Sequence, residues 1–318
     1  MGDDVTLRRW SRDDLAGMVA LINARVATKG EGEFATVASM AEQYDHLRNC
    51  DPDTDIVVAV DASGDIVGYS RVFWLDVDDG HRGYYVAFEA RDDVGGLTEA
   101  MFDWGLERAT QVAATHDHPD RRLDAWANEG TPRARLVEAR GFEPYAWSAF
   151  MVRPHFDDIP PAPLPDGLEV RPVEPDHWRR IWEADITAFR DHRFYVEQTE
   201  TDWERFIDEA KQGTELWQVA WDGDDVAGQV RTRFNDEEIA RLGRRRAWTE
   251  DISTRRDWRG RGVASALIAG SLRQLAEMGF DEAALGVDLD NPTGALGVYE
   301  RLGYRSVLRQ AQYHRRIT

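Results

Sequence analysis

The sequence repeats a set of landmarks at separations between 160 and 163 residues. The matched positions are Arg8 with Arg171, Gly68 with Gly228, and Gly141 with Gly303. A period this long indicates the duplication of a whole domain rather than a solenoid of short repeats. The length of 318 residues also suits two domains of ordinary size. The chain is therefore expected to fold as two copies of one domain.

A proline-rich segment separates the two copies. Residues 154–166 contain Pro160, Pro161, Pro163 and Pro165 within a short stretch. Such a composition is typical of a stiff, extended linker. We therefore expect domains at 1–153 and 167–318, joined by a linker at 154–166.

Each half alternates predicted strands with amphipathic helices. In the second half the helix that begins at Val263 carries apolar residues at the helical period, and Gly279 ends it. Strands are expected at 225–234, 248–254 and 283–287, with two final strands near 304–308 and 311–315. The polar stretch between 235 and 247 is expected to be a loop. The pattern predicts an α/β fold in which each domain has a mixed sheet flanked by helices.

Composition excludes several classes of function. The net charge of −20 argues against a nucleic-acid binder, which would present a basic face. No run of about 18 apolar residues occurs, and the acidic start lacks the features of a signal peptide, so no membrane association is expected. The single cysteine, Cys50, favours the reducing cytoplasm. His116 and His118 lack accompanying ligand residues, so we expect no metal site.

The segment 248–262 predicts an anion-binding turn. A predicted strand runs into Arg259-Gly260-Arg261-Gly262, and a helix follows directly. Such a turn presents free backbone N–H groups and the positive end of the helix dipole to an anion. The glycine spacing fits neither a Walker loop nor a dinucleotide-binding fingerprint. The turn therefore indicates a diphosphate site, with an ordinary turn carrying solvated arginines as the alternative.

These residues resemble the GNAT N-acyltransferase superfamily. The spacing Arg259-x-x-Gly262-x-Ala264 fits its Arg/Gln-x-x-Gly-x-Gly/Ala pattern, and the second half resembles the family over its whole length. Segments 241–244 and 287–295 also resemble a tandem-GNAT subgroup related to mycothiol acetyltransferases. The resemblance implies two tandem GNAT domains and acetyl-CoA as co-substrate.

The resemblance also implies which residues hold the coenzyme. The turn would bind the coenzyme A diphosphate through backbone N–H groups, and its residues are Arg259, Gly260, Arg261, Gly262, Val263 and Ala264. The strand backbone at Ile252, Ser253 and Thr254 would contact the pantetheine amides and polarise the thioester carbonyl. Ala295 is small enough to let the pantetheine arm pass. Asn291 could contact that arm. The alternative is that Asn291 only caps a helix whose first residue is Pro292, and this role alone would explain an asparagine here.

Tyr299 and Glu250 are the candidate catalytic residues. The segment 298–304 resembles the family's Tyr-x-x-Leu-Gly-Phe, so Tyr299 would protonate the departing thiolate, with a core or rim tyrosine as the alternative. An amine must be neutral to attack, which makes a base useful. Adjacent strand residues point to opposite faces, so at most one of Glu250 and Asp251 should face the cleft. GNAT enzymes commonly carry a glutamate on this strand, so the resemblance makes Glu250 the candidate base. A water relay and a merely solvated or salt-bridged Glu250 are the alternatives.

The first half lacks the residues that the second half is expected to use for coenzyme binding and catalysis. The alignment places Asp93 opposite Arg259, and a carboxylate there would repel a diphosphate. The position of Tyr299 is taken by Val137. The first domain is therefore expected to be a degenerate, non-catalytic copy.

Together, these features predict an N-acetyltransferase that transfers the acetyl group of acetyl-CoA directly to a small-molecule primary amine. We expect a cytoplasmic monomer or homodimer without a metal. Two alternatives remain open. One is a catalytically silent module that binds coenzyme A, and the other is a protein N-acetyltransferase.

Overall fold

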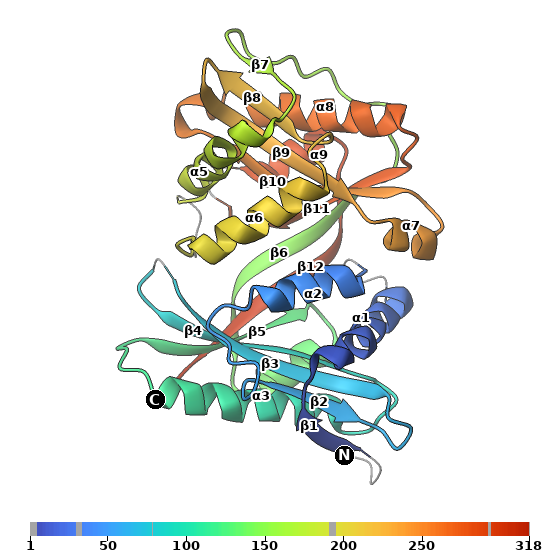
Figure 1. Cartoon of the computed structure of the whole chain (residues 1–318), viewed down its shortest axis with the longest axis vertical. Helices are drawn as coiled ribbons and strands as arrows, with labels where there is room; N and C mark the ends of the chain where they lie inside the picture. The colour runs from blue at the N-terminus through green and yellow to red at the C-terminus, as the bar shows by residue number, and fades with distance from the viewer. Residues whose placement is uncertain (1–4, 30–33, 78, 191–194, 292–293, 318) are drawn as a thin grey trace. The chain divides into compact units, whose positions relative to one another are not determined.

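The computed structural model describes residues 5–29, 34–77, 79–190, 195–291 and 294–317 (Figure 1). Two compact units form, Met1–Trp147 together with Arg309–Thr318, and Ser148–Leu308. These ranges differ from the expected ones because two strands, β6 (Glu143–Arg153) and β12 (Arg305–Arg316), each begin in one unit and end in the other. None of the described helices has both the length and the apolar character that crossing a membrane requires.

The first unit is a mixed sheet with helices on both faces. Its strands follow the order β1 (Thr6–Arg9), β2 (Ile56–Val60), β3 (Ile66–Asp76), β4 (Arg82–Ala90), β5 (Arg121–Asn128) and the end of β12. All neighbours are antiparallel except β4 and β5. One face packs on α3 (Leu97–Ala114) and α4 (Pro132–Ala139), and the other on α1 (Leu15–Lys29) and α2 (Val37–Asp45).

The second unit repeats this plan. Its strands follow the order β6, β11 (Glu282–Asp288), β10 (Arg246–Thr254), β9 (Asp225–Phe234), β8 (Gln218–Asp222) and β7 (Glu169–Val170). Only β10 and β11 run parallel. One face packs on α8 (Val263–Glu277) and α9 (Ala295–Arg301), and the other on α5 (Trp178–Phe189) and α6 (Glu200–Gln212). The mixed α/β fold with two similar units confirms the predicted fold class.

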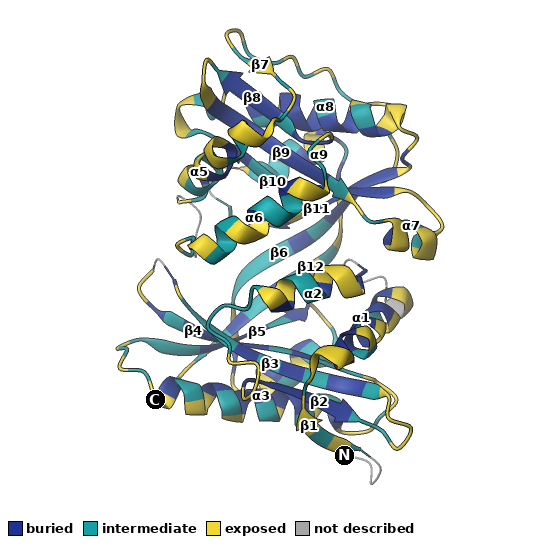
Figure 2. Ribbon diagram, in the orientation of Figure 1, coloured by how far each residue is buried: buried dark blue, intermediate teal, exposed yellow. Residues whose placement is uncertain are grey.

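Burial follows the alternation that a sheet covered on both faces imposes. Val219 packs toward α5 and α6, whereas its neighbour Ala220 packs toward α8. Figure 2 shows the same rule at the scale of the elements, with buried central strands and helices that expose their outer sides. α8 ends as predicted, because Gly279 adopts φ +74° and the Phe280 N–H bonds back to the Leu275 carbonyl.

Two expectations about individual elements were wrong. The stretch expected as a loop contains α7 (Asp236–Leu242), whose N-cap Asn235 accepts hydrogen bonds from the N–H groups of Glu237 and Glu238. Acidic residues in the first turn further suit this helix. The two expected final strands form one strand, β12, which runs from Arg305 to Arg316 and whose second part, from Gln310 to Arg316, pairs with β5.

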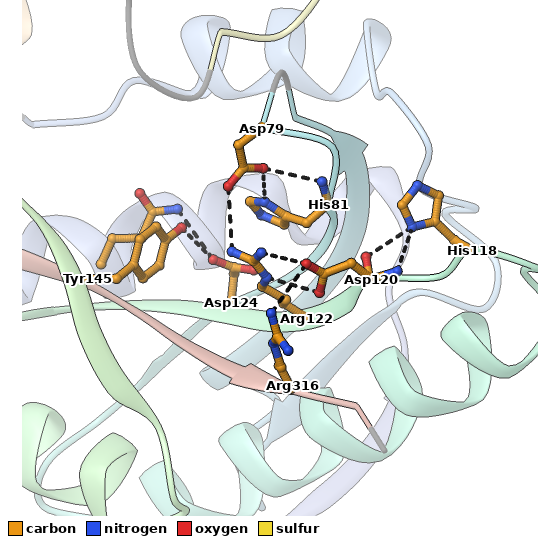
Figure 3. Close-up of polar contacts among 9 residues, drawn as sticks. Asp79, His81, His118, Asp120, Arg122, Asp124, Tyr145 and Arg316 are labelled. Atoms are coloured by element: carbon orange, nitrogen blue, oxygen red, sulfur yellow. Dashed lines mark hydrogen bonds and ion pairs between the residues drawn. The ribbon is translucent and has the colours of Figure 1, made fainter.

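A polar network lies on the sheet of the first unit (Figure 3). Asp124 of β5 is fully buried, and its Oδ1 accepts hydrogen bonds from the Tyr145 hydroxyl at 2.6 Å and from Gln312 at 3.5 Å. Its Oδ2 has no hydrogen-bond partner among the described residues. Arg122, also on β5, forms an ion pair with Asp120, which lies just before the strand. Burial raises the pKa of Asp124 to about 7.

The two histidines singled out in the sequence serve local contacts. Nδ1 of His116 lies 2.8 Å from the Tyr84 hydroxyl, and Nδ1 of His118 lies 2.9 Å from the Asp120 carbonyl oxygen. Over the residues that the structure describes, no group of three or more His, Cys, Asp or Glu side chains is arranged to hold a metal.

Replacing Asp124 with Asn should flatten part of the pH dependence of stability. The raised pKa means that the folded state holds a proton that the unfolded state releases near pH 4, so the wild-type chain loses stability as pH rises toward 7. The loss should be about 1.4 kcal/mol per pH unit at most. Thermal unfolding at pH 5 and pH 8 measures it.

Asp117→Asn is the matched control, because Asp117 is exposed and loses the same charge. Asp124→Asn should narrow the difference in melting temperature between the two pH values, and Asp117→Asn should leave it unchanged. Equal pH dependence in all three proteins would contradict the burial argument.

Candidate active site

A cleft opens where β10 and β11 stop pairing. The two strands pair from Arg246 with Glu282 to Trp248 with Ala284, and their described pairing ends there. β11 instead continues along β6, and β10 along β9. A cavity of about 820 Å³ lies beyond this point, within the second unit.

The cavity gathers nearly all of the site residues predicted from the sequence. Its lining includes Glu250 and residues 252–254 of β10, Arg259, Gly260 and residues 262–264 of the turn, and Asn291, Ala295 and Tyr299. Arg261 is absent from this lining, and its guanidinium lies 4.9 Å from the centre of the Trp258 ring. The fold therefore brings the strand, the turn and the α9 residues to one cavity.

The glycines set the shape of the turn. Gly260 and Gly262 adopt φ of +72° and +93°, and Gly262 is the N-cap of α8. A side chain at either position would meet no atom within 4 Å, so the requirement for glycine is conformational rather than spatial. The first N–H groups of α8, beginning at Val263, have no partner within the helix and stand at the cavity wall.

The turn arginine that lines the cavity also braces the backbone. The Arg259 guanidinium donates to the carbonyl oxygens of Thr254 at 3.2 Å and Ala188 at 2.8 Å. It thereby ties the end of β10 to the end of α5. The backbone N–H groups of the turn and the dipole of α8 remain the features suited to an anion.

A β-bulge changes the direction of the β10 side chains. The register between β9 and β10 shifts between Glu250 and Ser253, and Asp251 adopts φ +47°. Glu250 and Asp251 both line the cavity. The expectation that at most one of them faces the cleft was wrong, because the extra residue interrupts the strand alternation on which it rested.

The ion pairs of these two carboxylates confirm their common direction. Glu250 lies 2.7 Å from Arg233 Nη2, and Asp251 lies 3.0 Å from Arg231 Nη2. Arg231 and Arg233 are two residues apart on β9, so they project from the same face of the sheet. Strand alternation in the sequence would direct Asp251 away from the face that carries Glu250. The bulge places it at the cavity, so this position could not be predicted from the sequence pattern.

Tyr299 stands on α9 at the same cavity. Its side chain is 7% exposed. Burial raises the pKa of Tyr299 to about 12, and the charge of Asp288 adds to the rise. The phenol therefore stays protonated at neutral pH and can donate a hydrogen bond into the cavity.

The neighbouring Tyr304 holds the strands together where they begin to part. Its hydroxyl lies 2.7 Å from the Thr249 hydroxyl, which also lies 3.2 Å from the Ala284 carbonyl oxygen. The family segment usually has Phe here, and the extra hydroxyl links the connection between α9 and β12 to β10 and β11. Neither Tyr304 nor Thr249 was predicted to have this role.

The start of α9 differs from the expectation. Gly294, with φ +72°, is the N-cap of this helix, so the expected cap at Asn291 was wrong. The Gly294 N–H donates to the Asn291 carbonyl oxygen at 3.2 Å, which places Asn291 in the preceding turn. Pro292, expected at the first helical position, lies outside the described residues.

The first unit carries different side chains at the matching places. The pairing of β3 with β4 has no register shift, so the strand lacks the bulge of β10. α4 and α9 both end before a glycine of positive φ, Gly141 and Gly303, which aligns Arg133 with Ala295. The Arg133 guanidinium lies 3.8 Å from the centre of the Phe88 ring and pairs with a β4 carboxylate. An ion pair thus stands where the second unit has its cleft.

Comparison with known proteins agrees with this geometry. Residues 178–304 match the family model described as Acetyltransferase (GNAT) family. A mycothiol acetyltransferase of Catenulispora acidiphila is 30% identical over 189 residues, which cover 58% of this chain and 59% of that protein. A mycothiol acetyltransferase of Salinispora tropica is 28% identical over 306 residues, which cover 93% and 91%. The first match therefore spans about three fifths of the relative's length.

Solved structures share the whole fold. A GCN5-related N-acetyltransferase from Sphaerobacter thermophilus superposes with a TM-score of 0.72 at 23% identity, covering 99% of this chain and 96% of that one. A tandem GNAT protein from the clavulanic acid biosynthesis pathway gives a TM-score of 0.66 at 15% identity, covering 98% of each chain. Residues 178–304 of the second unit thus match the GNAT acetyltransferase family model, and the chain has the tandem GNAT fold.

Gly262→Ala should weaken the binding of coenzyme A. An alanine at φ +93° is strained by about 1–2 kcal/mol, and relaxing that strain would turn the N–H groups at the start of α8. The affinity measured by calorimetry should fall about tenfold.

Gly64→Ala is the control, since Gly64 has φ +88° in a hairpin turn of the first unit. It should lower the melting temperature without changing the affinity. An unchanged affinity in Gly262→Ala would show that the shape of the turn does not determine coenzyme binding.

Proposed function

We propose that the second unit transfers the acetyl group of acetyl-CoA to a small primary amine. One observation carries this conclusion: the parted strands, the glycine turn and Tyr299 all meet at a single cavity. A thioester arm between the strands would reach from the helix N-terminus, which suits phosphate, to the carboxylates at the bulge. The relatives named mycothiol acetyltransferase support a small-molecule acceptor, and their name makes an amine precursor of mycothiol the first acceptor to try.

The residues present suit acetyl-CoA. Backbone N–H groups at Gly260 and residues 262–264 would bind the diphosphate, and residues 252–254 of β10 would contact the pantetheine amides. Ala295 leaves room for the arm at the position where the first unit carries Arg133. A backbone N–H of β10 that faces the cleft would polarise the thioester carbonyl and stabilise the oxyanion.

The transfer itself needs two proton movements. The amine loses one proton to Glu250, directly or through water, and its nitrogen attacks the thioester carbon. The new C–N bond forms, the C–S bond breaks, and the thiolate leaves with the electron pair. Tyr299 donates a hydrogen bond to this sulfur, which takes up the second proton that the acylated nitrogen releases. Full transfer from a phenol of pKa about 12 to a thiolate of ordinary pKa about 8.5 is uphill, so the hydrogen bond supplies most of the benefit.

The first unit is proposed to serve the fold rather than the chemistry. Asp93, at the place of Arg259, is held by two hydrogen bonds from Arg91. Val137, at the place of Tyr299, is fully buried in the core of the first unit. Together with the ion pair of Arg133, these replacements support a single coenzyme site in each chain.

Tyr299→Phe should lower kcat and leave coenzyme binding nearly intact. Removing the hydroxyl removes an interaction that strengthens only as charge develops on the sulfur. We expect kcat to fall about 10- to 100-fold with the KM for acetyl-CoA within about twofold of wild type. Release of free thiol in the presence of a panel of small amines measures both.

Tyr313→Phe is the control, because it removes a largely buried hydroxyl that bonds to Glu138 in the first unit. Its kcat should match that of the wild type. Full activity in Tyr299→Phe would exclude Tyr299 from the chemistry. Coenzyme binding without acetyl transfer to any amine would instead support a silent binding module.

A further inference from the structure

Three carboxylates share one arginine beside the cavity. Arg231 of β9 lies 3.0 Å from Glu209 of α6, 3.0 Å from Asp251 of β10 and 3.5 Å from Asp185 of α5. The Arg231 side chain is 8% exposed and also stacks near Phe206. We call Asp185, Glu209, Asp251 and Arg231 the Arg231 cluster.

The Arg231 cluster has too few positive charges for its carboxylates. With every group ionised it carries three negative charges and one positive charge. The neighbouring carboxylate of Glu250 is not counted in this excess of negative charge, because it has its own partner, Arg233, at 2.7 Å. Asp185 is 15% exposed, so its charge is poorly solvated. Burial raises the pKa of Asp185 to about 6; the charge of Arg231 opposes this rise, and the charge of Asp251 adds to it. A cation placed in the cluster would offset the excess negative charge.

A buried amide beside the cluster lacks a partner. Gln229 is fully buried, and its Nε2 donates to Asp185 at 2.6 Å, which fixes the orientation of the amide. Its Oε1 then has no hydrogen-bond partner among the described residues. A buried acceptor without a donor is costly and uncommon. Gln229 pairs with Ser253 across β9 and β10, and Ser253 lines the cavity.

The cluster reaches the cavity through the bulge. Asp251 lines the cavity, and its side chain is 41% exposed. Without the extra residue in β10, strand alternation would direct it to the opposite face. The bulge therefore places Asp251, one member of this otherwise buried cluster, at the wall of the cleft.

We propose that the Arg231 cluster binds the acceptor as a cation, with the ammonium group held by Asp251 and Asp185. This inference rests on the proposed acetyl transfer and names its acceptor class as a primary amine that arrives protonated. An ammonium group has three N–H donors, which suit two carboxylates and the free Gln229 Oε1. Primary amines are mostly protonated at pH 7, so the cluster selects the abundant form. The ammonium then gives one proton to a carboxylate at the bulge, and the neutral amine remains for attack.

The test separates recognition of charge from turnover. The full-length protein, saturated with coenzyme A, is titrated by calorimetry with matched pairs of probes, glucosamine with glucose and phenethylamine with 2-phenylethanol. The amine of at least one pair should bind about tenfold more tightly than its hydroxyl analogue. Asp251→Asn and Asp185→Asn should lose this preference while their affinity for coenzyme A stays within about twofold of wild type.

Asp208→Asn is the matched control, because Asp208 neighbours Glu209 on α6 and pairs with Lys211 at the surface. It should keep the wild-type preference. If the wild type has no preference for the amines, or if Asp185→Asn and Asp251→Asn retain it, the inference is overturned. If the wild type prefers the amines but releases no thiol from acetyl-CoA, the cation site is supported and the proposed acetyl transfer is refuted.

Discussion

The site depends on the point at which β10 and β11 stop exchanging hydrogen bonds. Up to Trp248 and Ala284 the two strands form an ordinary parallel pair, and beyond it each strand keeps only its outer neighbour. Backbone N–H and C=O groups on the inner edges then need other partners, because unpaired buried backbone groups are costly. A ligand with amide groups along an extended arm can supply them. The Thr249 and Tyr304 hydroxyls fix where this parting begins.

The same fold occurs twice in the chain, and a few side chains distinguish the second unit, which has the cleft, from the first. Both units pair parallel strands briefly, and both start the following helix at a glycine of positive φ, Gly96 or Gly262. In the second unit a bulge turns carboxylates into the cleft, and Ala295 leaves room beside them. In the first unit the strand is regular, and Arg133 stacks on Phe88 with an ion pair to the same strand. The two copies share the scaffold, and we propose that the chemistry is concentrated in the second.

Sequence patterns predicted the parts of the site that depend on local rules. The turn at Gly260 and Gly262 and the helix after it follow from residue spacing, whereas the place of Tyr299 follows from the family resemblance. The structure brings these residues to one cavity. The bulge could not be predicted, because it depends on pairing with β9 and breaks the alternation used to orient Glu250 and Asp251. The Arg231 cluster was equally hidden, since its members come from four separate elements. α7 was missed although Asn235 carried a capping signal, because its short, acidic sequence read as a loop.

The central claim is that each chain binds one coenzyme A, in the cleft of the second unit. Calorimetric titration of wild type and of Ala295→Arg with coenzyme A tests it most directly, because the substitution copies Arg133 into the proposed channel. The account predicts one site per chain in wild type and none in a folded Ala295→Arg. Two sites in wild type, or undiminished binding in Ala295→Arg, would contradict it.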